Sequence, residues 1–176
     1  MIRLGGQGIS SEGSSKPQMF RRGVSAIALI CSIGLASLFA IYPYFLSVNP
    51  DGRHVGMDLP HYEEMLCKME EGDGLNLTYT FFTLRDRPLS VLMILGVLKI
   101  TGFSSWTVLK FLPLLLCLFL ILATFYFVLE ATGDLTISSI TALLTAFSYP
   151  VTVGMLGALF SNWIALIEVY VFSGLL

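Results

Sequence analysis

Charged residues are scarce in this chain. Only 12% of its 176 residues are Asp, Glu, Lys or Arg, whereas 55% are hydrophobic. A soluble domain carries about a quarter charged residues, so the composition excludes an ordinary cytosolic enzyme. The net charge of -2 offers no basic surface, and we expect no nucleic-acid partner. Because the apolar residues stand in long runs, we expect an all-α, polytopic membrane protein in contact with membrane lipids.

Cysteine is rare as well, with three in the chain. Cys31 and Cys117 lie in apolar runs, and Cys67 lies in a polar region. The chain has no CxxC motif and no Cys/His cluster, so it predicts neither a disulfide framework nor a zinc site. We predict no cofactor, and no residue pattern supports a divalent metal. A glycosylation sequon begins at Asn76, which fits a loop outside the cytoplasm.

The N-terminal residues 1–23 are rich in Gly and Ser and predict a disordered cytoplasmic tail. Their cations are Arg3, Lys16, Arg21 and Arg22. Residues 24–46 carry no charge, and these 23 residues span about 34 Å as a helix, enough to cross a membrane. The positive-inside rule places the N-terminus in the cytoplasm. A cleaved signal peptide is the alternative, although its apolar region is normally about 7–15 residues long.

Residues 47–105 form the predicted outer loop. Its segment 47–87 holds eight acidic and four basic residues. Within it, a short amphipathic helix is predicted over 58–71, because apolar residues recur there at helical spacing. These residues are Leu59, Tyr62, Met65, Leu66 and Met69. Such a helix lies on the membrane surface or docks on the protein.

A second loop helix, over 88–100, has two interpretations. Its uncharged stretch 88–98 spans only about 16 Å, which predicts a re-entrant or interfacial helix. Extended to 106, the segment spans a membrane, and Lys99 and Lys110 then favour a cytoplasmic end. The two versions place Asn162 outside and inside, respectively.

About four membrane helices are expected in the domain 24–176. They cover 24–46, 107–130, 135–152 and 162–176, with a bend near Pro150. Since the chain stops inside the last apolar run without a polar cap, we expect a truncated sequence. Glu168 is the one acid in that run. It has two interpretations: at membrane depth it faces a partner or a wet cavity, and if the cut-off helix ends near it, it lies at an interface.

The stretch from Gly56 to Tyr62 carries the candidate chemistry. Asp58 stands where the amphipathic helix begins, and a carboxylate there can act as general base on an acceptor hydroxyl. His61 and Tyr62 can supply hydrogen bonds nearby. Asp is also a favoured N-cap residue, and physical reasoning alone favours that role. The two roles are compatible.

A basic N-terminus, one membrane helix and an outer loop opening with Gly-x-Asp-x-x-x-Tyr resemble the GT-C superfamily of membrane glycosyltransferases. Arg87-Pro88 before a short helix ending at Gly102 is similar too, as is the later helix ending in Ser148-Tyr149-Pro150. The resemblance covers most of residues 24–176 through short motifs. Some members carry a second acid in the next outer loop, where this chain has Asn162. The resemblance makes Asn162, with His61 and Tyr62, a candidate for binding substrate.

The resemblance implies transfer of a sugar from a polyprenyl-phosphate-linked donor to an acceptor on the non-cytoplasmic face. Asp58 matches the essential Asp of the family. Arg85 and Arg87 are candidates for binding the donor phosphate, and physical reasoning alone favours their other interpretation, anchoring at the membrane interface. The family also keeps the helix after Pro88 in the outer loop, which places Asn162 on the side of Asp58.

A non-enzymatic accessory subunit, which binds a partner through its acidic outer loop, is the alternative function. A transporter is disfavoured because internal repeats are absent. If the family is correct, C-terminal helices of the same protein complete the site. An enzyme needs Asp58 for chemistry, whereas a binding module tolerates Asn there, since Asn also caps helices well.

Overall fold

The computed structural model describes residues 15–53, 55–71 and 88–176, and all regular structure in these ranges is helical. The elements are α1 (Ser15–Ile41), the 3-10 helix η1 (Tyr42–Tyr44), α2 (Leu59–Glu71), α4 (Pro88–Thr101), α5 (Ser105–Thr132), α6 (Leu135–Ala146), α7 (Tyr149–Gly157) and α8 (Phe160–Leu175). The predicted all-α class is therefore confirmed for this part of the chain.

Three helical segments are long and apolar enough to cross a membrane. They are Arg21–Tyr44, Ser105–Thr132 and Leu135–Gly154. The fourth predicted membrane helix, α8, is also apolar but has 16 residues. This is the composition of a multi-pass membrane protein.

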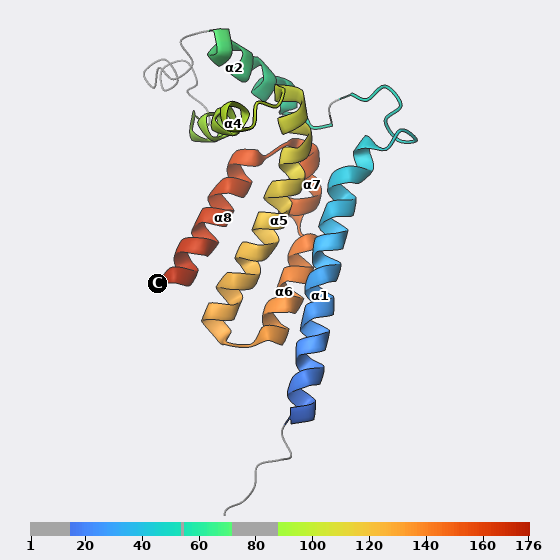
Figure 1. Ribbon diagram of the computed structural model, residues 1–176, viewed down its shortest axis with the longest axis vertical. Helices are drawn as coiled ribbons and strands as arrows, with labels where there is room; N and C mark the ends of the chain where they lie inside the picture. Colours follow the sequence, from blue (N-terminus) through green and yellow to red (C-terminus); the bar gives the residue numbers. More distant parts are fainter. Residues whose placement is uncertain (1–14, 54, 72–87) are drawn as a thin grey trace, which may run out of the picture.

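The long helices lie side by side, and α2 and α4 cover one end of the bundle (Figure 1). Helix α1 packs on α6, and α5 packs on both α6 and α8. We call the end with α2 and α4 the loop end. The opposite end, with the α5–α6 connection, is the turn end. Arg21 of α1 and Asp134 line the same pocket there, so α1 starts at the turn end.

The segment that had two interpretations is divided between two helices. Gly102 takes a left-handed φ of +67° and its N–H donates to the Leu98 carbonyl at 2.8 Å, which ends α4. Ser104 then caps α5 by accepting from the Thr107 N–H. Helix α4 lies across the loop end and contacts α2. The start of α8 lies at this same end, and Asn162 is in its first turn. Which side of a membrane this end faces stays a prediction.

Three helix boundaries differ from the predicted ones, and prolines lie next to two of them. Helix α1 begins at Ser15, so the basic end predicted as disordered tail is helical from that residue on. It stops at Ile41, five residues early, where Pro43 enters η1. The predicted bend near Pro150 is a break at Phe147 and Ser148. Pro150 itself lies in the first turn of α7, where its missing N–H costs nothing.

The amphipathic helix α2 docks on the protein. Its residues Leu59, Tyr62 and Leu66 are buried, in one cluster with apolar residues of α4 that include Val91 and Leu95. On the other face, Lys68 donates to Glu64 at 2.6 Å. That hydrogen bond, with the charge of Lys68, lowers the pKa of the exposed Glu64 carboxyl. The helix therefore presents its polar face outward and its apolar face to α4.

Asp134 caps α6, and its carboxylate accepts from the N–H groups of Thr136 and Ile137. These bonds lower its pKa below the ordinary value of 3.8, with a smaller contribution from Arg21. We predict that Asp134→Ala lowers the Tm at pH 7, whereas Asp134→Ser preserves the cap. Because the folded-state pKa is the lower one, the charge contributes fully above pH 3.8 and is lost as pH falls through the folded value.

Thermal unfolding followed by circular dichroism, between pH 7 and about pH 3, tests this cap. The difference in Tm between wild type and Asp134→Ala should become smaller as the carboxylate is protonated. If this difference in Tm is the same at pH 7 and at about pH 3, the charge of Asp134 contributes nothing to stability.

Candidate functional site

The segment that carries Asp58 is fastened to the connection between α7 and α8. The Met57 N–H donates to the Leu156 carbonyl at 3.0 Å, and the Asp58 N–H donates to the Gly157 carbonyl at 3.4 Å. Glycine is required just before these bonds. Gly56 has a φ of +147°, and a Cβ at this position would lie 3.0 Å from the Cβ of Ala158. The outer loop and the α7–α8 connection thus approach closely along their backbones.

Asp58 lies at the N-cap position of α2. Its carbonyl accepts the Tyr62 N–H at 3.1 Å, which is the first helical hydrogen bond. The residue is partly exposed, beside the last turn of α7. Its predicted place at a helix start is confirmed, and its role as a base stays a prediction.

Tyr62 belongs to a cluster of three hydroxyl groups that joins α2, α4 and α8. Its hydroxyl lies 3.0 Å from Ser161 Oγ, and Ser90 Oγ donates to the same Ser161 oxygen at 2.8 Å. The tyrosine ring is fully buried and lies 5.1 Å from the Phe160 ring, centroid to centroid. The hydroxyl predicted to bind substrate is directed into the protein, and its contact with substrate stays a prediction.

Ser90 and Ser161 were not among the predicted site residues. Each lies in an apolar helix, and Ser161 is separated from its partners by 71 and 99 positions. In the sequence, each of them is one serine in the first turn of a mostly apolar helix. Such a serine does not reveal which residue it will contact. Their meeting follows from the packing of α8 under α2 and α4.

The other predicted site residues are dispersed. His61 and Asn162 are exposed, and the Asn162 N–H donates to the Leu159 carbonyl at 3.1 Å in the first turn of α8. The structure brings Asn162 to the loop end, one position from the hydroxyl cluster. Arg85 and Arg87 lie outside the described residues.

Trp163 fixes the α7–α8 connection from inside. Its Nε1 donates to the Pro150 carbonyl at 2.6 Å, and only a glycine fits at position 154, where a Cβ would lie 2.6 Å from Nε1. Ala158, between the two helices, is buried with a left-handed φ of +53°. The carbonyls of Leu156 and Gly157, which accept the hydrogen bonds of the Asp58 loop, therefore lie in a tightly packed part of the structure.

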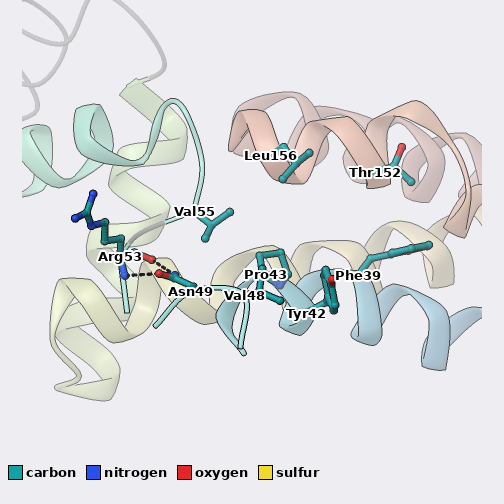
Figure 2. Close-up of a pocket in the computed structure, with 9 residues that line it drawn as sticks. All are labelled: Phe39, Tyr42, Pro43, Val48, Asn49, Arg53, Val55, Thr152 and Leu156. Atoms are coloured by element: carbon teal, nitrogen blue, oxygen red, sulfur yellow. Dashed lines mark hydrogen bonds between the residues drawn. The ribbon is translucent and has the colours of Figure 1, made fainter. Parts of the chain in front are cut away.

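A cavity of about 520 Å³ opens beside this loop (Figure 2). Its lining is mainly apolar and comes from α1, η1, the loop and α7. The lining residues are Phe39, Tyr42, Pro43, Val48, Asn49, Arg53, Val55, Thr152 and Leu156. Leu156 itself accepts the Met57 N–H, and Val55 lies two positions before Met57. The cavity and Asp58 thus share the same two chain segments.

Asn49 shapes the loop at the edge of this cavity. Its Nδ2 donates to the Arg53 carbonyl at 2.6 Å and its Oδ1 accepts the Arg53 N–H at 3.0 Å. The Arg53 guanidinium points away from the apolar lining residues and pairs with Asp51 at 3.0 Å. The loop therefore supplies Asn49 and Arg53 at the edge of the cavity, together with part of its apolar lining, and the helices supply most of the rest.

Within the described ranges, no three His, Cys, Asp or Glu side chains gather as metal ligands would. Compared with known protein families, curated proteins and solved structures, the chain has no match. The resemblance to GT-C glycosyltransferases thus remains an expectation based on short motifs.

We predict that Gly56→Ala disrupts the docked loop. An alanine there has a forbidden φ and a clash with Ala158, whereas Gly52→Ala, at φ +62° with open space around it, has backbone strain alone. Gly52→Ala should lower the free energy of unfolding by about 1–2 kcal/mol. Gly56→Ala should lower it by at least about 1 kcal/mol more. Denaturant unfolding in detergent measures both, and equal losses would contradict the close approach.

We also predict that Tyr62→Phe destabilises the fold by about 1 kcal/mol, because it removes one hydroxyl of the buried cluster. A double-mutant cycle with Ser161→Ala should show a coupling of at least about 0.5 kcal/mol. Tyr149→Phe is the matched control, since Tyr149 is 68% exposed. If the double variant loses the sum of the free energies of unfolding that the two single variants lose, the two hydroxyls are not coupled.

Proposed function

We propose that the chain is a membrane glycosyltransferase, or the N-terminal part of one, with Asp58 as the base. It transfers a sugar from a polyprenyl-phosphate-linked donor to an acceptor hydroxyl on the non-cytoplasmic face. The supporting observation is the docked loop, which holds a carboxylate-bearing residue next to an apolar cavity at one end of a membrane-type bundle.

The proposed orientation rests on the cations before the first span, and Lys99 and Lys110, in elements of the loop end, favour the opposite one. Arg21 and Arg22 lie at the turn end beside Asp134, and Lys or Arg near a membrane helix end favours the cytoplasm. The loop end then faces away from the cytoplasm. Aromatic residues of η1, Tyr42 and Tyr44, end the first span there, as expected at a membrane interface.

The reaction exchanges one bond at the anomeric carbon for another. The Asp58 carboxylate takes the proton of the acceptor hydroxyl, whose oxygen bonds to the anomeric carbon. The bond from that carbon to the phosphate oxygen breaks, and polyprenyl phosphate leaves with the electron pair. Cationic side chains favour this departure, and Arg85 and Arg87 are the proposed ones.

The cavity suits the lipid part of such a donor. Its volume of about 520 Å³ lies in the range of about 300–1,000 Å³ of small-molecule sites. Its walls combine Phe39 and Pro43 of the first span with Leu156 of α7, and its polar edge is the loop that leads to Asp58. An isoprenoid segment held there places the attached phosphate toward the loop end.

The test compares wild type with Asp58→Asn in lipid vesicles, with a panel of radiolabelled hexosyl and pentosyl polyprenyl phosphates. Asn is also a good N-cap residue, so the substitution removes the base and preserves the helix start. We predict at least about a 100-fold loss of sugar transfer with an unchanged Tm. Asp51→Asn, in the same loop and exposed, is the control and should transfer at the wild-type rate.

Transfer that survives in Asp58→Asn would reduce Asp58 to a helix cap. If wild type transfers none of the donor sugars, the accessory-subunit hypothesis takes precedence. Binding of a protein partner to the acidic outer loop is then the activity to measure.

A further inference from the structure

Glu168 lies deep along the bundle. Helix α8 runs beside α5 in the same direction (Figure 1). Glu168 shares a groove with Phe119 of α5, and two residues further on the Tyr170 ring stacks on Phe127 with centroids 5.7 Å apart. Both phenylalanines lie inside the uncharged run 111–129 of α5. In a membrane that α5 crosses, Glu168 is thus at the depth of the hydrocarbon core.

The Glu168 side chain is exposed at the edge of an apolar groove of about 260 Å³ between α4, α5 and α8. Met93 and Val97 of α4, Leu115 and Phe119 of α5 and Ile164 of α8 are among its lining residues. Among the described residues, no hydrogen bond or ion pair satisfies the carboxylate. An ionised carboxylate left bare in hydrocarbon is costly, and a cationic partner offsets that cost.

A second copy of the chain does not supply that partner from its described helices. The cations there lie at the two ends of the bundle. Lys16, Arg21 and Arg22 are in the first turns of α1 at the turn end, and Arg53, Lys68, Lys99 and Lys110 are in or next to the elements of the loop end. A copy inserted in the same orientation brings none of them to mid-depth. Lipid headgroups are also too far from this level.

We infer that the groove beside Glu168 binds a transmembrane helix outside residues 1–176 that carries a lysine or arginine near its middle. Its apolar side chains fill the groove, and its cation donates to the Glu168 carboxylate. This inference is independent of sugar transfer, because neither Asp58 nor the cavity next to it takes part.

The test uses the chain in phosphatidylcholine vesicles, with a donor dye on the exposed Cys67 in a Cys31→Ser background. Acceptor-labelled leucine-rich peptides of about 24 residues carry Lys, Asn or Leu at the centre. We expect energy transfer to show that the Lys peptide binds about three- to twenty-fold more tightly than the Leu peptide. Glu168→Gln, which is close in shape, should remove this difference.

Two further variants make the result specific. Glu130→Gln, at the turn end, should leave the preference for the Lys peptide unchanged. Glu168→Lys should transfer the preference to a peptide with a central Glu, with helicity checked by circular dichroism. Four outcomes would overturn the inference: equal binding of the Lys and Leu peptides, equal binding of the Lys and Asn peptides, a preference that persists in Glu168→Gln, or self-association of the chain that depends on Glu168.

Discussion

Two backbone hydrogen bonds, from Met57 and Asp58 to the carbonyls of Leu156 and Gly157, fasten the loop end of the molecule. Each is worth about 1 kcal/mol net, but their position gives them wider importance. They connect the first span, through its loop, to α7 and α8, which follow about a hundred residues later. The start of α2 and the buried Tyr62 hydroxyl follow this contact directly along the chain, and Leu156, one of its acceptors, also lines the cavity. The contact therefore acts together with the Tyr62–Ser161 hydrogen bond to place α2 over α8.

Cation–π contacts of Lys110 also stabilise the loop end. The Lys110 ammonium lies 4.6 Å from the centroid of the Trp106 ring and 5.3 Å from that of the Tyr44 ring. Such cation–π contacts are worth about 0.5–2 kcal/mol, depending on exposure. Lys110 thereby ties η1, at the end of the first span, to the first turns of α5. Only in the version with 88–106 spanning the membrane does this lysine favour a cytoplasmic helix end. In the structure it helps to hold the wall from which the loop departs.

Local features of the fold were predictable where one residue determines a boundary. Gly102 ends a helix because it adopts a left-handed conformation, and Asp134 begins one because its side chain replaces missing backbone partners. Asp58 at the start of α2 belongs to the same class. By contrast, the meeting of Tyr62, Ser90 and Ser161 depends on the packing of three helices. Helical spacing shows that α2 has an apolar face, but it does not distinguish a membrane surface from α4 as the surface that covers it.

The polar side chains within the long helices illustrate why Glu168 differs from them. In α6, Ser138, Ser139 and Thr141 each donate a hydroxyl hydrogen to the carbonyl four residues earlier, at 2.7–2.9 Å. A hydroxyl group in a membrane helix can therefore form its hydrogen bond with a backbone carbonyl of the same helix. A carboxylate can only accept, and the N–H groups of a helix interior are already bonded. Glu168 therefore needs a donor from outside its own helix, and its exposed position requires that donor to come from outside the described bundle.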